Sequence, residues 1–379
     1  MRVEQLENRW SQDQFMTGIE LGNWFDVLKR NGWRVDPDYL HRAAWITGIS
    51  LPATLFGKID DLRFGRRIND MEIDPTPLII LGHWRSGTTH LHTMLGRDPN
   101  HTYTNIFQVI FPTSFLTTLK AGTALLKDAL PEKRSYDNMP QGWFEPAEDE
   151  IALMKLTGGR SFYTALMFPD KFAEYEKYID FVEATHEERM IWKNALSYFI
   201  KKVMIGTGNK RVILKSCPHS ARIRMLLELF PNAKFLHIHR HPARVFQSTV
   251  HMRSKVDWEN FMHRPEKTFI EQRREHTALI GERLFDRLLA DKGLIPEENL
   301  IEIAYSDLIG NEHQVLKDIY RKFELPDWER FERNLLPYLD SIADYKTNRL
   351  TMDPEIEEFV YERWRPVYDA YGYKKEYSA

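Results

Sequence analysis

The feature that most constrains the fold is the segment from Leu78 to Leu95, LIILGHWRSGTTHLHTML. A short apolar run ended by glycine is typical of a strand that is buried on both faces of a parallel sheet. Gly82 and Gly87 have the spacing of a phosphate-binding loop, in which glycines let backbone amides approach an anion at the start of a helix. The segment therefore predicts a strand, a phosphate loop and a helix that begins near Thr88.

This loop lacks the lysine that ATP- and GTP-binding loops carry directly after their second glycine. Thr88 stands in that position, and a cation lies three residues earlier, at Arg85. In P-loop NTPases the lysine reaches the β- and γ-phosphates, and a later aspartate helps to hold Mg²⁺. No aspartate ends the later apolar runs at 211–216 and 233–240. The loop favours a phosphate-bearing ligand that is neutralised by protein cations, and we expect no metal.

Three more apolar runs predict strands, and helical patterns alternate with them. The predicted strands cover 211–216, 233–240 and 299–305, and the predicted helices cover 220–233, a segment from Pro242 and 314–325. This alternation predicts an α/β fold with a parallel central sheet flanked by helices, a P-loop-like architecture.

We expect a single domain over residues 1–379. It would comprise a helical N-terminal segment over 1–72, an α/β core over 75–310 and a helical C-terminal part over 311–379. A long helical insertion over 100–210 interrupts the core, and insertions of this length usually cap a site or build a substrate pocket.

The most apolar early segment runs from Ala43 to Ile59 and is interrupted by Pro52. Its uninterrupted part is too short to span a bilayer, so we expect no transmembrane segment. It predicts a buried helix pair, and an interfacial membrane contact is the alternative.

Charge and cysteine content restrict the partners and the compartment. The 379 residues carry a net charge of -3, so no global basic field indicates a nucleic-acid partner. The single cysteine, Cys217, excludes an internal disulfide and a cysteine-based zinc site. Together with a polar N-terminus that lacks a secretory apolar region, this favours a cytoplasmic location.

Two segments together resemble the nucleotide motifs of sulfotransferases, which use 3′-phosphoadenosine-5′-phosphosulfate (PAPS). GHWRSGTTHLHTML resembles their 5′-phosphosulfate loop. LHIHRHPARVFQSTVH resembles their 3′-phosphate motif, in which an arginine at a strand end, here Arg240, precedes a serine, here Ser248, by eight positions. Acidic residues within 136–154 and the IAYSDL segment at 303–308 resemble a bacterial-type branch, and the likeness extends over about 75–350.

The resemblance implies a role for each matching residue, with PAP as the nucleotide product. Arg240 and Ser248 would hold the 3′-phosphate. The 5′-phosphate and the sulfuryl group would be held by Arg85, Ser86, Gly87, Thr88 and Thr89. His90 stands where the cytosolic branch carries a tryptophan that helps to bind adenine, so the adenine contact stays open. Lys346 is the candidate for the lysine-rich 3′-phosphate loop of that branch.

Sulfuryl transfer needs cations at the sulfuryl and leaving oxygens and a base for the acceptor hydroxyl. Arg85 is the first candidate cation. Lys215 is the second, because it ends a predicted strand and corresponds to a strand-end lysine in related enzymes.

Two candidates for the base remain open. The cytosolic branch uses a histidine two residues after its strand-end lysine. This chain has Cys217 there, which we expect to be a packed small residue, and His219 two positions further on. Other branches use a glutamate, and the FEPAEDE segment supplies Glu145, Glu148, Asp149 and Glu150. Of these we favour Glu148, although the same acids also suit a helix N-terminus.

The acceptor is the least constrained part of the prediction. The insertion is apolar over 105–131 and 158–169, which favours a bulky apolar alcohol such as a sterol or lipid. The alternatives are a carbohydrate sulfotransferase with the same donor, a P-loop kinase or NTPase, and a PAPS-binding protein without activity.

Overall fold

The computed structural model describes residues 14–376, except for 75, 135–138, 209 and 344–350. The chain divides into two compact units. The first comprises Met1–Ile73, Thr104–Gly206 and His251–Arg273, and the second comprises Asp74–Tyr103, Thr207–Val250 and Arg274–Ala379. The expected organisation as a single domain stays a prediction.

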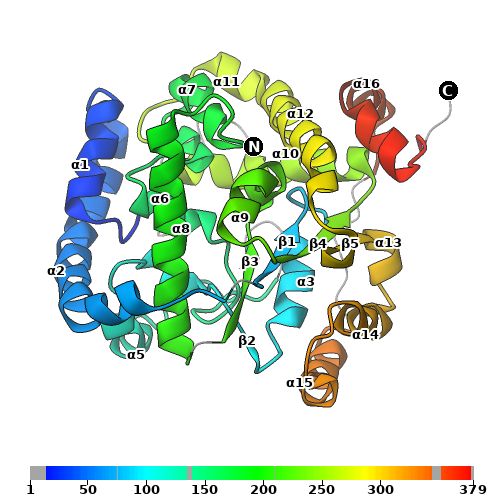
Figure 1. Cartoon of the computed structure of the whole chain (residues 1–379). Helices are drawn as coiled ribbons and strands as arrows, with labels where there is room; N and C mark the ends of the chain where they lie inside the picture. The colour runs from blue at the N-terminus through cyan, green and yellow to red at the C-terminus, as the bar shows by residue number, and fades with distance from the viewer. Residues whose placement is uncertain (1–13, 75, 135–138, 209, 344–350, 377–379) are drawn as a thin grey trace. The chain divides into compact units, whose positions relative to one another are not determined.

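The second unit holds a five-stranded, wholly parallel sheet with the order β2-β3-β1-β4-β5 (Figure 1). The strands are β1 Leu78–Leu81, β2 His101–Tyr103, β3 Arg211–Lys215, β4 Lys234–His239 and β5 Leu300–Ala304. The predicted α/β fold is therefore confirmed, and so are the four strands expected from apolar runs. The edge strand β2 was not predicted, because its three residues, HTY, form no apolar run.

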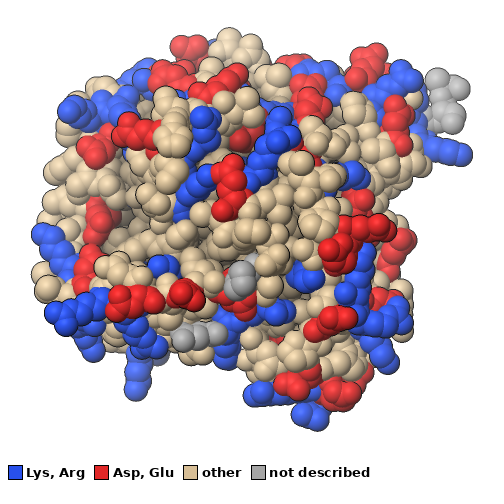
Figure 2. Space-filling view, in the orientation of Figure 1, with Lys and Arg blue, Asp and Glu red and all other residues tan. Residues whose placement is uncertain are grey.

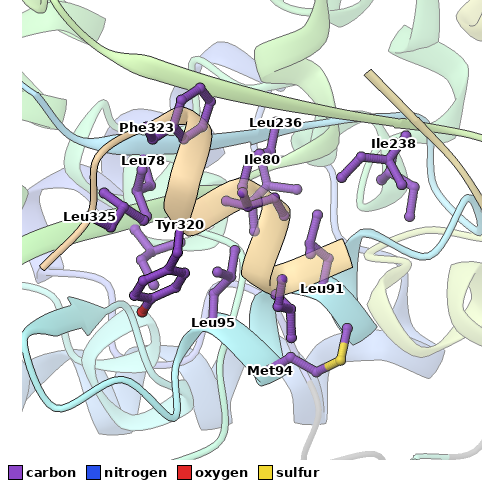
Figure 3. Close-up of a cluster of buried hydrophobic side chains, with 14 of the residues drawn as sticks. Leu78, Ile80, Leu91, Met94, Leu95, Leu236, Ile238, Tyr320, Phe323 and Leu325 are labelled. Atoms are coloured by element: carbon purple, nitrogen blue, oxygen red, sulfur yellow. The ribbon is translucent and has the colours of Figure 1, made fainter. Parts of the chain in front are cut away.

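Strand β1 lies at the centre of the sheet and is buried along its whole length. Its side chains pack with residues of β4, of helix α3 (Thr88–Leu95) and of helix α14 (Glu312–Lys322) (Figure 3). This cluster includes Leu78, Ile80, Leu91, Leu95, Leu236, Ile238, Tyr320 and Phe323. Leu78 and Ile80 belong to this cluster, and Ile79 and Leu81, which point to the other face of the sheet, are fully buried as well. Burial on both faces thus explains the continuous apolar pattern of β1.

The strand order reverses direction at β1. After β1 the chain enters the β2–β3 side of the sheet, and after β3 it crosses to the β4–β5 side. Ligands of open α/β sheets bind outside the carboxyl ends of the strands at such a switch point. The loops that follow β1, β3, β4 and β5 therefore form the region in which a site is expected.

The remaining helices of the second unit complete the layers around the sheet. They are α9 Ile223–Leu229, α13 Tyr305–Leu308, α15 Trp328–Ser341, α16 Pro354–Tyr371 and, apart from its first residue, α12 Arg273–Asp291. Helix α10 Pro242–Asn260 is divided, with 242–250 in the second unit and 251–260 in the first. The first unit contains α1 Leu21–Arg30, α2 Leu40–Asp70, α4 Ile106–Ile110, α5 Phe115–Leu125, α6 Glu150–Leu156, α7 Phe172–Tyr175, α8 His186–Thr207 and α11 Lys267–Glu271.

Two predictions for the N-terminal region are wrong in detail. The segment Ala43–Ile59 is part of one 31-residue helix, α2, and not of a helix pair. Pro52 removes a backbone hydrogen bond inside the helix. Packing of α2 against α1 and α5 stabilises the continuous helix despite this loss. Residues 15–18 form a turn where a helix was expected, and Gly18 there has a left-handed φ of 83°.

None of the described helices is long and apolar enough to cross a membrane.

Candidate functional site

The loop after β1 requires both of its glycines. Gly82 has φ 150°, and its N–H donates to Ser220 Oγ at 2.7 Å. A Cβ at Gly82 would lie 2.6 Å from the carbonyl oxygen of Ile238. Gly87 has φ 106°, and a Cβ there would lie 2.7 Å from the ring of Tyr305. Close approach of β4 and of Tyr305, the residue directly after β5, therefore explains the Gly-x4-Gly spacing.

Arg85 sits at the tip of this loop in a left-handed conformation, with φ 70°. Such a backbone costs about 1–3 kcal/mol for a residue other than glycine and often marks a functional site. The N–H and the hydroxyl of Ser86 both donate to the carbonyl of His83, at 3.2 and 2.7 Å. Ser86 therefore shapes the turn, whereas the amides at the start of α3 lack partners within the helix and suit an anion.

The two predicted phosphate motifs meet in the second unit. Arg85 Nε donates to Ser248 Oγ at 3.0 Å. Arg240 directs Nη1 toward the Arg85 carbonyl at 3.4 Å and stacks on the ring of Tyr305, 4.3 Å from its centroid. Burial lowers the pKa of the Arg240 guanidinium, and the positive charges of Arg85 and Arg244 lower it further. This grouping of cations is suited to a multiply charged anion.

Lys215 approaches the same loop from the neighbouring strand. It ends β3, where it pairs with Ile80 of β1, and its Nζ donates to Thr89 Oγ1 at 3.2 Å. The side chain is buried, and a buried cation needs polar or anionic partners. Lys215 thus contacts the first turn of α3, and Arg85 lies three residues before this helix begins.

His90 and Lys346 have different outcomes. His90 Nε2 lies 3.6 Å from Glu312 Oε1, so this side chain contacts α14. Burial lowers the pKa of His90, although Glu312 opposes the shift, and the ring is expected to be neutral near pH 7. Its suggested adenine contact gains no support from this geometry. Lys346 lies outside the described residues.

The two candidate bases lie in different units. His219 is fully buried in the 3₁₀ turn Cys217–Ala221 of the second unit, directly after β3. Cys217 is buried there as well, which agrees with its expected packing role. Glu148 lies in the first unit, where it is half-buried and accepts a hydrogen bond from Tyr163 Oη at 2.6 Å.

The acidic segment around Glu148 also forms a helix N-terminus, as the alternative interpretation proposed. Helix α6 begins at Glu150, which is fully buried and accepts a hydrogen bond from Ser161 Oγ at 2.6 Å. Asp149 is its buried N-cap residue. Glu148 is therefore more accessible than Asp149 or Glu150.

The C-terminal segment contacts the motif that follows β4, which the sequence did not reveal. Tyr373 Oη lies 2.8 Å from His239 Nδ1, and His241 Nε2 lies 2.9 Å from the carbonyl of Lys374. Glu376 forms an ion pair with Arg244. These contacts join residues more than 130 positions apart, and no local pattern predicts such pairing. They surround the segment that carries Arg240.

Among residues 14–376, excluding the undescribed gaps, no three His, Cys, Asp or Glu side chains are grouped so as to hold a metal ion.

Comparison with known proteins decides the family. A model described as "Sulfotransferase family" matches residues 77–330, which is more than half of the chain. The chain belongs to the sulfotransferase family. This sulfotransferase is also 32% identical over 377 residues to the ω-hydroxy-β-dihydromenaquinone-9 sulfotransferase Stf3 of Mycobacterium tuberculosis and to that of Mycobacterium bovis. Each alignment covers 99% of this chain and 96% of the relative.

Two solved structures have the same fold as this sulfotransferase. STF9 from Mycobacterium avium has a TM-score of 0.65 at 18% identity, with coverage of 98% of this chain and 99% of that chain. STF1 from M. tuberculosis has a TM-score of 0.64 at 17% identity, with coverage of 97% and 99%. The predicted membership of a bacterial-type sulfotransferase family is confirmed, and the protein is an enzyme that transfers a sulfuryl group from a donor to a hydroxyl acceptor.

Proposed function

We propose that this sulfotransferase uses PAPS and that the cations at the β1 and β4 strand ends bind it. The observation that supports this most is the hydrogen bond from the Arg85 side chain to Ser248 Oγ, together with the hydrogen bond from Arg240 to the Arg85 carbonyl. PAPS carries phosphate groups at two positions, so it needs cations from two motifs. ATP lacks the 3′-phosphate, and proteins that bind it with a P-loop usually also carry an aspartate that helps to hold Mg²⁺.

Each side chain then has a role in the transfer. Arg85 and the amides at the start of α3 hold the 5′-phosphate and the sulfuryl group. Arg240 and Ser248 hold the 3′-phosphate. Lys215 stabilises the negative charge that develops on the bridging oxygen as the acceptor oxygen attacks in line, and PAP leaves. Glu148 and His219 remain the alternatives for the base that removes the acceptor proton.

We propose a lipid alcohol as the acceptor. Support comes from Stf3, whose name identifies a hydroxylated menaquinone as its acceptor and which aligns with almost the whole chain. The apolar segments predicted to line a pocket agree with this class. Highly charged glycans fit such segments less well. A cytoplasmic location stays a prediction.

An acceptor panel with ³⁵S-labelled PAPS tests this proposal. The panel compares a long isoprenoid alcohol in detergent, a sterol, a phenol and a monosaccharide. We expect transfer to the isoprenoid alcohol to be fastest. Faster transfer to the sugar would favour the carbohydrate alternative, and the absence of transfer to any hydroxyl would contradict the proposed donor and acceptor together.

A further inference from the structure

Exposed apolar side chains gather in one short part of the sequence. Of the fifteen exposed large hydrophobic residues among those described, seven lie between Phe25 and Leu62. They are Phe25, Trp33, Leu40, Leu51, Leu55, Phe56 and Leu62. Scattered exposed apolar residues are normal, whereas a concentration of them on neighbouring elements marks an interaction surface.

Helix α2 carries five of these seven residues and has two distinct faces. Leu51, Leu55 and Leu62 lie four and seven residues apart, which places them on one side of the helix. They are 57%, 59% and 87% exposed. Ile46 and Ala53 are buried on the other side, where α2 packs in the first unit. Among the described residues, the packing that holds the helix therefore does not use the apolar face.

The exposed positions in the first half of α2 carry no carboxylate, lysine or arginine. Over residues 40–57 they are Leu40, His41, Ala44, Gly48, Leu51, Pro52, Leu55 and Phe56. The only charged residue in this range, Arg42, is buried and donates to the carbonyls of Trp258 and Phe261. An uncharged exposed surface of this length differs from an ordinary solvated helix face.

The second half of α2 adds positive charge next to this apolar face. Its exposed cations are Lys58, Arg63, Arg66 and Arg67, and its exposed acids are Asp61 and Asp70. Four cations against two acids give a local excess of two positive charges. Asp61 also accepts a hydrogen bond from Tyr198 Oη at 3.0 Å. Blue and red side chains lie together at the lower left of Figure 2, where Figure 1 places the C-terminal end of α2 and helix α5.

We propose that the exposed face of α2 docks on an anionic lipid membrane. The apolar half inserts between the headgroups, and the basic end contacts anionic lipid. Stable peripheral binding takes two signals, and this helix supplies an apolar face and a cationic cluster. The charge complementarity favours this occupant over a second copy of the chain. The inference rests on the proposed lipid acceptor, because such an acceptor resides in the bilayer.

Sedimentation with vesicles tests the proposal without measuring transfer. The full chain is mixed with phosphatidylcholine vesicles, with or without phosphatidylglycerol, at low ionic strength. We expect sedimentation with the anionic vesicles only. The double variant Leu51→Glu/Leu55→Glu should reduce the partition coefficient about tenfold or more, and so should Arg66→Glu/Arg67→Glu. The control Leu336→Glu changes an exposed leucine on α15 and should bind as the wild type does.

Two further measurements separate the possible results. Thermal unfolding should show that all variants are folded, and transfer to a detergent-solubilised alcohol should be unchanged in Leu51→Glu/Leu55→Glu. Wild-type protein that stays in the supernatant would overturn membrane docking even if lipid sulfation is intact. Equal sedimentation of the leucine double variant and the wild type would also overturn it. A change from dimer to monomer in light scattering, without vesicle binding, would instead assign the face to a second copy.

Discussion

At the scale of single residues, the proposed specificity depends on Arg240. Its guanidinium is held between the ring of Tyr305 and the loop that carries Arg85. A charge-assisted hydrogen bond to a phosphate contributes about 1.5–3 kcal/mol. This residue, rather than the adenine contact, should therefore distinguish nucleotides with a 3′-phosphate from those without one.

Replacing Arg240 should weaken the binding of PAP selectively. We expect Arg240→Ala to lower PAP affinity by about 10- to 100-fold, with little effect on AMP, and Ser248→Ala to have a smaller effect in the same direction. Isothermal titration calorimetry measures both. Arg321→Ala is a matched control, because Arg321 is an exposed arginine that pairs with Asp318. A variant that still prefers PAP over AMP to the same degree would contradict the assignment.

The base can be identified by conservative replacements. If Glu148 is the base, Glu148→Gln should lower kcat by about 10²- to 10⁴-fold, and Tyr163→Phe should lower it less. If His219 is the base, His219→Gln should have the large effect instead. Rates are compared at saturating donor across a range of pH. Near-normal turnover in both Glu148→Gln and His219→Gln at every pH would remove both candidates.

At the scale of elements, the sequence was most informative where one local rule determined the structure. The apolar run, the glycines and the start of α3 at Thr88 were predicted because strand burial and close backbone approach each leave a local signal. The candidate cations also lie at places with a local signal, because Lys215 ends β3, Arg240 directly follows β4 and Arg85 lies inside the glycine loop. Strand β2, the continuity of α2 through Pro52 and the docking of the C-terminal segment depend on distant contacts, and they were missed.

The packing of α3 on β1 gives a stability prediction at this scale. Leu91 is fully buried in the cluster of Figure 3. We expect Leu91→Ala to lower the free energy of unfolding by about 2–5 kcal/mol, because it leaves a cavity in this core. Leu62→Ala, at an exposed position on α2, should change it by only about 0.5 kcal/mol. Urea unfolding measures both. Equal destabilisation would contradict the described core.

At the scale of the whole molecule, buried neutral histidines should make stability sensitive to acid. Burial lowers the pKa of His83 from 6.5 to about 4. The unfolded chain therefore binds a proton that the folded chain does not, between pH 6.5 and 4. Above pH 6.5 the ring is neutral in both states and does not reduce the free energy of unfolding. As the pH falls from 6.5 toward 4, protonation of the unfolded state lowers the free energy of unfolding by on the order of 3 kcal/mol in all.

Thermal unfolding at several pH values tests this linkage. We expect Tm to fall between pH 6.5 and 4.5, and His83→Gln to make the decrease smaller because glutamine does not titrate. Burial lowers the pKa of His239 to about 4 as well, so part of the acid sensitivity should remain in that variant. A variant with the same pH profile as the wild type would show that His83 does not contribute.

The central claim is that this sulfotransferase transfers a sulfuryl group from PAPS with Arg85 and Lys215 as its cations. The most direct test measures ³⁵S transfer from PAPS to a long isoprenoid alcohol in the presence of EDTA, for the wild type, Arg85→Ala and Lys215→Ala. We predict transfer by the wild type without added metal and a loss of about 10²-fold or more in kcat for each variant. Unchanged turnover in either variant would contradict its assignment, and an absence of wild-type transfer from PAPS would contradict the account as a whole.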